Sequence, residues 1–387
     1  MRKSAVSNST LALAGLGALL IYILACTSFS PDDSKVLYAT VDARSGLTAI
    51  AVYDRKAGKS ELLFEPSTQD AGKLAAKPAI LRPQWLEDGH SFLTAWVADS
   101  DDKALSLAVL PFDRRGPART FLLTGLGDGA TMFYYWPVPV AGSSVLISGE
   151  SNSLIRLDLG TGVMRRQTNQ PELVLLPSPD NDHLFYLGVT NDTEGPCECG
   201  LLNPETFART PLFQIKDKKV SLFSLALSRD AKRLAYQVED EKPPVVHLLE
   251  TGRPARTLSL ASLGDKMEVN VRHFSPKHDI LYGSFRDAAV GTHDAYGFVE
   301  IPLDGSPIRK TTLISNGGKS GDKGMLAYFQ IDISHDGKTL AVESLWLACG
   351  NDDLKAEDCA LFLVDLTDSH RKVTKAPIPL PPKNIFK

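Results

Sequence analysis

One short phrase recurs through this chain, and its spacing limits the folds that the chain can adopt. The phrase reads Ser-Pro-Asp-Gly, two further residues and an apolar segment, and it returns about every 50 residues. Its seven copies begin at Ser30, Leu86, Pro139, Ser178, Ser228, Ser275 and Ser334. A large apolar residue stands four positions after the Asp slot in each copy, for example Val36, Leu234 and Leu340. A fixed period of this length is typical of a solenoid, an array or a propeller.

Each repeat contains four short segments that predict β-strands. The pairs Asp88-Gly89 and Asp336-Gly337 tolerate positive φ, which predicts a two-residue hairpin turn between the first and second strands. A third strand, such as 154–158, and a more polar fourth strand, such as 119–123, alternate with the period of strands half exposed at a rim. Four antiparallel strands without helical periodicity make one propeller blade. We therefore predict an all-β, seven-bladed β-propeller of four-stranded antiparallel blades, with six or eight blades as alternatives.

The Ser-Pro-Asp-Gly-x-x-Leu phrase resembles the TolB-type, WD40-like propeller repeat of bacteria. The resemblance covers roughly residues 27–380, and the copy at Pro139 departs most from the pattern. It implies the fold and not a function, because propellers host many functions. TolB itself carries an additional α/β domain before its propeller, for which this chain has no room, so a TolB-specific role does not follow. The inner strand of blade one is expected from residues 27–30, or alternatively from the segment 377–386.

Residues 1–25 have the features of a signal peptide. Arg2 and Lys3 precede the uncharged stretch 11–25, whose 15 residues are fewer than a membrane span needs but suit a signal h-region. The sequence Ile23-Leu24-Ala25-Cys26 resembles a bacterial lipobox, in which the cysteine is diacylated and becomes the mature N-terminus. Thr27 follows the cysteine in place of the Asp of the inner-membrane retention signal. An uncleaved signal anchor is the alternative.

These observations predict a single propeller domain over residues 27–387 that is exported and anchored through lipidated Cys26. The expected location is the cell envelope, on the periplasmic face of the outer membrane or on the cell surface, or the periplasm if the signal segment is uncleaved or the chain is not anchored. Without Arg2 and Lys3, the chain has 40 Lys+Arg against 46 Asp+Glu, a net charge of −6. No basic run indicates nucleic acid as a partner. We expect a monomer.

Four cysteines remain after Cys26, and an even number in an oxidising compartment predicts disulfides. Cys349 and Cys359 flank the loop 350–358, where antiparallel neighbours could bring them within bridging distance. Cys197 and Cys199 occupy the equivalent loop of blade four, where a strained bridge and metal binding are both open. No histidine stands at zinc-ligand spacing, so no metal site is assigned.

The sequence carries no catalytic signature, and we assign no catalytic residue and no cofactor. A Gly-x-Ser-x-Gly elbow is absent, and the segment 317–321 lacks the first glycine of a phosphate loop. The scattered histidines, His335 among them, are expected to be structural or solvated. Acidic clusters such as Asp99–Asp102 do not match a calcium-binding loop.

Aromatic residues supply the candidate partner contacts. Core packing is the default for the run Phe133-Tyr134-Tyr135-Trp136 and for Trp346, and an exposed anchor near the channel mouth is the alternative. The loops that join second and third strands, such as 98–103, 191–200, 287–294 and 350–358, collect the long insertions on one face. Because binding usually resides on long loops of a rigid scaffold, this face is expected to meet the partner.

The function expected from these features is that of a lipid-anchored scaffold that binds a protein or peptide of the bacterial cell envelope. The alternative is a ligand- or sugar-binding sensor, or an enzyme, that uses the central channel.

Overall fold

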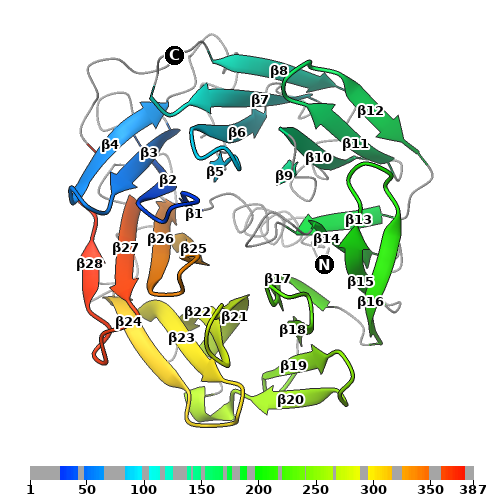
Figure 1. Ribbon diagram of the computed structural model, residues 1–387. Helices are drawn as coiled ribbons and strands as arrows, with labels where there is room; N and C mark the ends of the chain where they lie inside the picture. Colours follow the sequence, from blue (N-terminus) through cyan, green and yellow to red (C-terminus); the bar gives the residue numbers. More distant parts are fainter. Residues whose placement is uncertain are drawn as a thin grey trace, which may run out of the picture.

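The computed structural model describes residues 27–41, 48–64, 83–97, 104–113, 118–124, 137–140, 143–149, 153–168, 172–176, 184–189, 197–216, 220–239, 241–264, 267–287, 295–315, 325–347 and 359–379. These residues form seven antiparallel sheets of four strands around one axis (Figure 1). In every sheet the strands pair in chain order, with the first strand innermost and the fourth at the rim. The predicted seven-bladed β-propeller is confirmed.

The first four blades follow the repeats. Blade 1 contains β1 (Ser28–Phe29), β2 (Lys35–Val41), β3 (Thr48–Asp54) and β4 (Lys59–Phe64). Blade 2 contains β5 (Gln84–Trp85), β6 (Ser91–Val97), β7 (Ala104–Pro111) and β8 (Arg119–Thr124). Blade 3 contains β9 (Val138–Val140), β10 (Ser144–Gly149), β11 (Ser153–Asp158) and β12 (Met164–Gln167). Blade 4 contains β13 (Glu172–Leu176), β14 (Leu184–Val189), β15 (Cys197–Leu202) and β16 (Arg209–Ile215).

Three further blades complete the ring. Blade 5 contains β17 (Val220–Leu227), β18 (Arg233–Val238), β19 (Val245–Glu250) and β20 (Arg256–Ser259). A short 3-10 turn, η2 (Ala261–Leu263), leads to blade 6 with β21 (Met267–Phe274), β22 (Ile280–Asp287), β23 (Ala295–Pro302) and β24 (Arg309–Ser315). Blade 7 contains β25 (Met325–Ile333), β26 (Thr339–Leu347), β27 (Cys359–Asp365) and β28 (Val373–Lys375).

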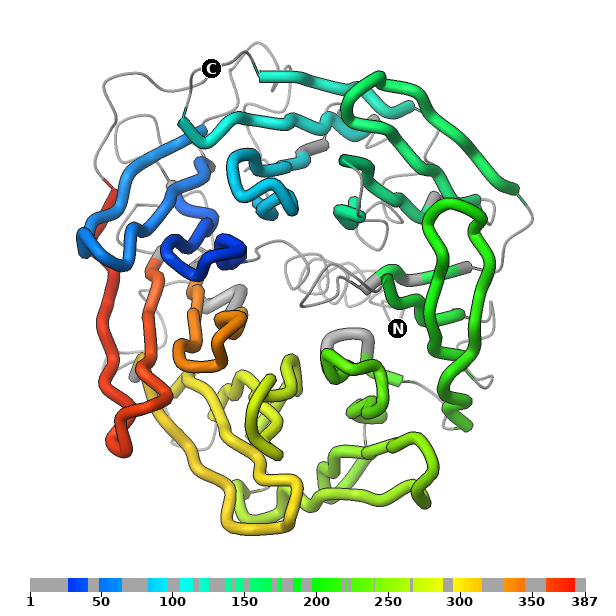
Figure 2. Tube along the Cα trace, viewed as in Figure 1, coloured from blue at the N-terminus to red at the C-terminus, as the bar shows by residue number. Residues whose placement is uncertain are grey.

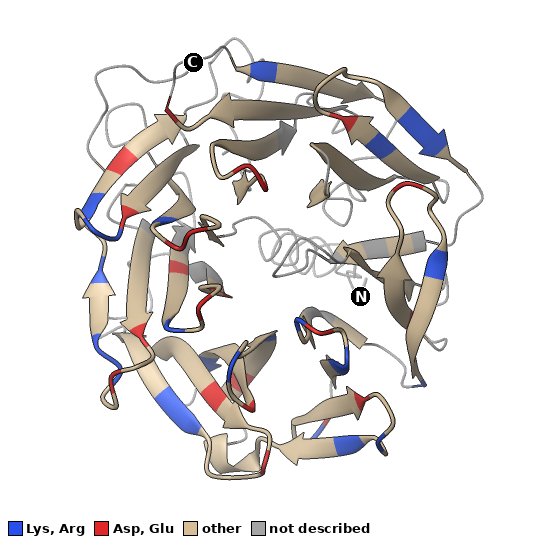
Figure 3. Cartoon of the chain, in the orientation of Figure 1, with Lys and Arg blue, Asp and Glu red and all other residues tan. Residues whose placement is uncertain are grey.

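The hydrophobic core is divided into seven clusters, each between two neighbouring blades. Side chains alternate across each strand, so one blade supplies two of these clusters. In β2, for example, Val36 packs toward blade 7 and Leu37 toward blade 2, and both are fully buried. Charged residues lie mainly at the turns and along the outer strands (Figure 3). The stability of the ring therefore comes from stacking blade on blade.

The repeated phrase builds a hydrogen-bonded turn and not the two-residue turn that we expected. In blade 1 the backbone N–H of Ser30 donates to the carbonyl of Lys35, which leaves a loop of the four residues 31–34. Within it, the N–H of Asp33 donates to the carbonyl of Ser30, and Asp33 has a φ of 57°. The same pattern recurs at Gly89, Ala231 and Gly337, each with positive φ. Proline second, aspartate third and glycine fourth are the residues that such a four-residue loop favours.

The Ser and Asp of the phrase hold this turn together. Ser334 Oγ donates to Asp336 Oδ1 at 2.7 Å and accepts the backbone N–H of Thr339 at 2.9 Å. Asp336 Oδ1 also accepts the backbone N–H of Lys338 at 2.9 Å. Blades 1 and 5 repeat these bonds with their own Ser and Asp residues. The most conspicuous pattern in the sequence is thus explained by local structure.

The glycine of the phrase also makes room for the preceding blade. A Cβ on Gly337 would lie 2.8 Å from Cγ of Pro276, the proline of the blade 6 turn. We expect Gly337→Ala to destabilise the protein by about 2–3 kcal/mol, since overpacking adds to the strain of positive φ. Gly58, at φ +65° with open space around it, is the matched control, and Gly58→Ala should cost about 1 kcal/mol. Equal losses in urea unfolding would contradict the proposed clash.

The two faces of the ring differ in their connections. The turn face carries the turns between first and second strands and those between third and fourth strands, such as 31–34 and 366–372. The loop face carries the connections between second and third strands and the crossings between blades. Residues 98–103, 190–196, 288–294 and 348–358 of the loop face lie outside the described residues.

No blade combines strands from both ends of the chain. Blade 1 uses β1 as its inner strand, as expected, and the described residues of the alternative segment, 377–379, form no strand. Blades 7 and 1 lie side by side although they come from opposite ends of the sequence (Figure 2). Side-chain and backbone contacts between these two blades therefore close the ring.

Candidate functional site

The junction between blades 7 and 1 brings together charged residues from the two ends of the chain. The carboxylate of Asp33, in the blade 1 turn, accepts the backbone N–H groups of His335 and Asp336, both at 2.9 Å. It also contacts Nδ1 of His335 at 2.8 Å. Asp33 stands where three other copies of the phrase have glycine, at Gly89, Gly142 and Gly337. The residue that departs from the repeat thus joins the first blade to the last.

The electrostatics of this contact favour an ion pair. The hydrogen bond to Asp33 raises the pKa of His335 above its usual value, against the opposing effect of burial. Burial acts to raise the pKa of Asp33, but the hydrogen bonds from His335 and Asp336 outweigh it and hold the pKa below its usual value. Each partner therefore stabilises the charged form of the other.

Arg55, which follows β3, adds a second link across the junction. Its Nη1 donates to the backbone carbonyl of Asp33, and its Nη2 donates to Oγ1 of Thr339 in blade 7. Both acceptors are neutral oxygen atoms. The guanidinium also lies over the ring of Phe29, 5.8 Å from its centroid.

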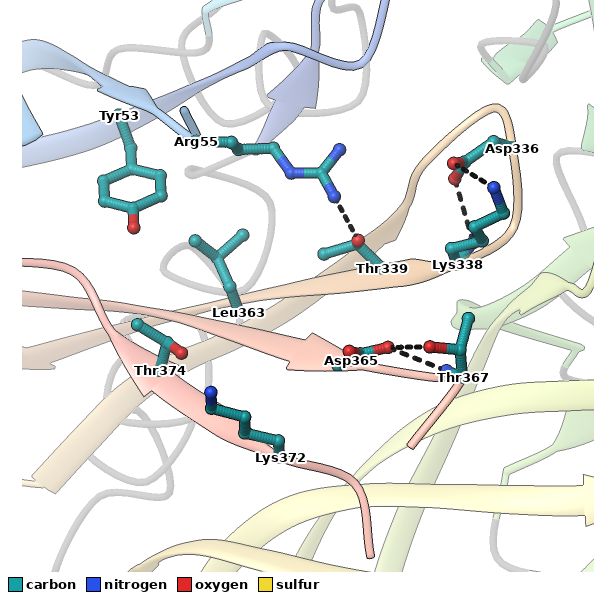
Figure 4. Close-up of a pocket in the computed structure, with 10 residues that line it drawn as sticks. All are labelled: Tyr53, Arg55, Asp336, Lys338, Thr339, Leu363, Asp365, Thr367, Lys372 and Thr374. Atoms are coloured by element: carbon teal, nitrogen blue, oxygen red, sulfur yellow. Dashed lines mark hydrogen bonds and ion pairs between the residues drawn. The ribbon is translucent and has the colours of Figure 1, made fainter. Parts of the chain in front are cut away.

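A groove of about 360 Å³ opens beside these contacts on the turn face (Figure 4). We call it the closure groove, and it is lined by Tyr53, Arg55, Asp336, Lys338, Thr339, Leu363, Asp365, Thr367, Lys372 and Thr374. Blade 1 contributes the first two of these residues and blade 7 the others. The groove combines cations, carboxylates and hydroxyl groups with the aliphatic side chain of Leu363.

The two carboxylates of the groove are engaged by their own turns. Asp365 accepts the backbone N–H of Thr367 at 2.8 Å and its Oγ1 at 2.6 Å, and these bonds lower the pKa of Asp365. Burial acts to raise the pKa of Asp336, but the bonds from Ser334 and Lys338 lower it overall. Both groups are therefore ionised at neutral pH and already accept hydrogen bonds from neighbours in sequence.

The cations of the groove are less fully engaged. Lys338 reaches Asp336 at 3.6 Å, whereas Arg55 contacts neutral oxygens. The ammonium group of Lys372 lowers the pKa of Asp365 but forms no hydrogen bond or ion pair with a side chain among the described residues. Three cations against two carboxylates leave the groove with a net positive charge. Such a lining suits a ligand that carries a carboxylate next to an apolar group.

A second titratable pair lies between the innermost strands of blades 6 and 7. Nε2 of His273, on β21, is 3.9 Å from Oδ1 of Asp332 on β25 and 2.9 Å from the carbonyl of Ile331. Burial lowers the pKa of His273 and raises the pKa of Asp332, so the surroundings disfavour both charges. In the described residues no group of three or more His, Cys, Asp or Glu side chains is arranged to hold a metal ion.

The structure also buries a carboxyl group inside the blade 7–blade 1 junction. Glu343, on β26, is 1 % exposed and faces blade 1, as do Ala341 and Leu361. Among the described residues its oxygens make no hydrogen bond of good geometry, although the N–H of Ala39 is near enough to favour the charged form. Burial nevertheless raises the pKa of Glu343 to about 8.

The bridge between Cys197 and Cys199 that the sequence left open is not formed. Both lie on β15, which begins at Cys197, and Cys199 is a buried free thiol. On one face of a strand, the Cβ atoms of residues i and i+2 are about 6.6 Å apart, because each residue adds about 3.3 Å. The Cβ atoms of a disulfide must approach to about 4 Å. Both side chains pack into the cluster between blades 4 and 5, and burial raises the pKa of Cys199 to about 12. They therefore belong to the core and not to an exposed loop.

Other predicted site residues lie wholly or partly outside the described residues. These are Cys26, the aromatic run 133–136 and Cys349. Cys359 begins β27 and pairs with Leu345. In this strand register, the residue opposite Cys359 is therefore Leu345 and not Cys349. The backbone of Trp346 lies within β26, opposite Leu326. The bridge between Cys349 and Cys359 stays a prediction.

Sequence reasoning missed the closure groove. Arg55, Asp336 and Lys372 lie in three different turns, and no sequence pattern connects them. The one available signal was Asp33, beside the groove, at a position where three other copies of the repeat have glycine. The lining residues become neighbours because the ring returns to its starting point.

Comparison with known proteins defines the class of this protein. No family model and no curated protein matches the sequence. A structure described as the complex of KlAtg21 with the coiled-coil of AgAtg16 matches with a TM-score of 0.53 at 11% identity, over 92% of this chain and 99% of that chain. An acylaminoacyl peptidase in complex with Z-Gly-Gly-Phe-chloromethyl ketone matches with a TM-score of 0.50 at 10% identity, over 84% of this chain and 51% of that one.

These similarities concern the fold alone. The protein is a seven-bladed β-propeller. In the part of the chain that the structure describes, no helix has the length and apolar character needed to cross a bilayer.

Proposed function

We propose that this protein is a lipid-anchored scaffold of the bacterial cell envelope, with TolB-type repeats, that binds a protein or peptide through the closure groove. The signal peptide and lipobox ending at Cys26 support the anchor and the location. A ring of seven packed blades supplies the rigid support that a binding surface needs. The observation that carries the proposal is the groove itself, in which three cations and the aliphatic Leu363 line the same cavity.

The groove matches the chemistry of an acidic peptide segment. Lys372 and Arg55 offer charge-assisted hydrogen bonds to a carboxylate, and the hydroxyls of Tyr53 and Thr374 line the same groove. Leu363 offers contact to an apolar side chain beside that carboxylate. The volume of about 360 Å³ accommodates one or two side chains and not a folded domain. A partner would therefore insert a short segment while its remaining surface rests on the turn face.

Site-specific photocrosslinking tests this proposal. A photoreactive benzoylphenylalanine would replace Thr374, which is exposed in the outer strand β28 of blade 7. The control carries it at Thr257, which is exposed in the outer strand β20 of blade 5. We expect one envelope protein to crosslink in intact cells from position 374 and not from position 257. Adding Lys372→Glu to the Thr374 variant should reduce that crosslink, because the substitution reverses the charge facing the ligand.

Two outcomes would contradict the proposal. One is crosslinking of the same proteins from positions 374 and 257, which would indicate nonspecific encounters. The other is an undiminished crosslink in the Lys372→Glu variant, which would remove the groove from the binding site. A thermal melt of each variant checks that the ring remains folded.

A further inference from the structure

We propose that the protein sits on its membrane with the loop face toward the lipid and the turn face, including the closure groove, directed away. This orientation rests on the proposed membrane anchor at the N-terminus. It follows from how little chain separates that anchor from the ring.

The first described residues are firmly part of blade 1. Thr27 is 6% exposed, and Phe29 is 4% exposed within the cluster between blades 7 and 1. Ser28 and Phe29 pair with Leu37 and Val36 of β2. The hydroxyl of Ser28 also accepts the backbone N–H of Trp85 at 3.2 Å, which ties the strand to blade 2. The packed structure of the ring therefore includes Thr27, the residue that follows Cys26.

The chain direction fixes the face from which the anchor leaves. β1 runs toward the turn at 31–34, so its first residue lies at the loop-face end of the innermost strand. Adjacent Cα atoms are about 3.8 Å apart, so Cys26 cannot be farther than that from Thr27. A flexible tether of ten residues would span about 17 Å and let the ring rotate. Here no such tether lies between the lipidated residue and the sheet.

The alternative form of the anchor leads to the same orientation. An uncleaved apolar segment 11–25 would also end next to Cys26 and enter the ring through Thr27. Whether the chain is held by acyl groups or by an apolar segment, the membrane adjoins the loop face. The turn face is displaced from it by the length of a strand, about 20 Å for a strand of six or seven residues.

This orientation has a consequence for partner binding. The sequence placed the partner on the loop face because that face carries the long insertions. With the membrane there, a soluble partner meets the turn face, where the closure groove opens.

The test measures the depth of two labelled positions on vesicles. Full-length protein purified from membranes would carry a fluorescent amino acid at Glu239, exposed at the loop-face end of β18, or at Lys277, exposed in the blade 6 turn. Each variant is reconstituted into phosphatidylcholine vesicles that contain a nitroxide-headgroup lipid quencher. We expect quenching at position 239 to be several-fold stronger than at position 277. Flotation and acyl labelling of the same samples, with Cys26→Ser beside them, report on the anchor.

The outcomes separate the orientation from the anchor. Flotation with equal quenching at both positions, or with stronger quenching at 277, overturns the orientation while the anchor stands. Failure of the wild-type protein to float overturns the anchor and the orientation with it. If Cys26→Ser loses the acyl label yet floats with the same quenching pattern, the apolar segment is the anchor and the orientation is supported.

Discussion

Replacing Arg371 with alanine is expected to lower the free energy of unfolding by about 3 kcal/mol, because it leaves a buried carboxylate without its main partner. Glu300 on β23 is 3% exposed. The Arg371 guanidinium donates to it through Nε at 3.0 Å and through Nη2 at 2.7 Å. Nη1 of Arg371 also donates to the carbonyls of Leu366 and Asp368, which holds the last turn of blade 7 against blade 6. Arg309, 3.7 Å from Glu300, will compensate in part.

Denaturant unfolding of three variants tests this explanation. Arg253→Ala is the control, since Arg253 forms an exposed pair with Glu250 at 3.1 Å and should lose less than about 1 kcal/mol. Arg371→Lys should fall between wild type and Arg371→Ala, because lysine keeps the charge but not the two-pronged geometry. Removing both charges with Arg371→Met and Glu300→Leu should recover much of the stability. A loss for Arg371→Ala no larger than that of the Arg253 control would refute the role given to this pair.

Glu343→Gln is expected to raise stability in alkaline solution, with a gain of about 2–3 kcal/mol near pH 8.5. The pKa of Glu343 is about 8 in the folded protein, against an ordinary value of 4.5. Between these two values the folded state keeps a proton that the unfolded state has released. The stability of the wild-type protein should therefore fall as pH rises through this window and level off above about pH 8. The full shift corresponds to about 5 kcal/mol, which relaxation of the junction will reduce.

Unfolding free energies measured at intervals from pH 5 to pH 9 would test this expectation. Glu343→Leu should show the same loss of pH dependence as Glu343→Gln, since both remove the buried acid. Glu239→Gln, at an exposed glutamate, should retain the wild-type profile. A Glu343→Gln profile parallel to that of the wild type would mean that the carboxyl group is not the source of the slope. The His335–Asp33 pair also weakens as pH rises through the raised pKa of His335, so some slope should remain in every variant.

The architecture could be predicted because each repeat encodes its own blade. The Ser, Pro, Asp and Gly of the phrase act within one four-residue loop, and the bonds of Ser334 and Asp336 span no more than five residues. Period-2 alternation likewise reports on a single strand. The prediction of a two-residue turn was wrong because aspartate and glycine also suit a longer loop in which one residue has positive φ. That error changed the turn and left the blade count intact.

The cysteines show where sequence reasoning reached its limit. Cys197 and Cys199 were assigned to a loop because the boundary of a strand is weakly encoded in sequence. The structure begins β15 at Cys197 and directs both side chains into the cluster between blades 4 and 5. Deleting 191–200 as a loop would therefore remove four residues of a strand. Their burial depends on contacts with blade 5, whose residues lie outside the short sequence segment around the two cysteines.

By itself, the sequence determined the class of fold, the number of blades and the place of the turn between the first and second strands, because these features rest on interactions between residues close in the chain. The tertiary structure alone decided how the ring closes and what the closure creates. His335 and Asp33 are 302 residues apart and meet because seven blades complete one circuit. The same circuit forms the closure groove and buries Glu343 between the last blade and the first. Contacts between distant residues depend on the geometry of the whole ring, and no single repeat specifies it.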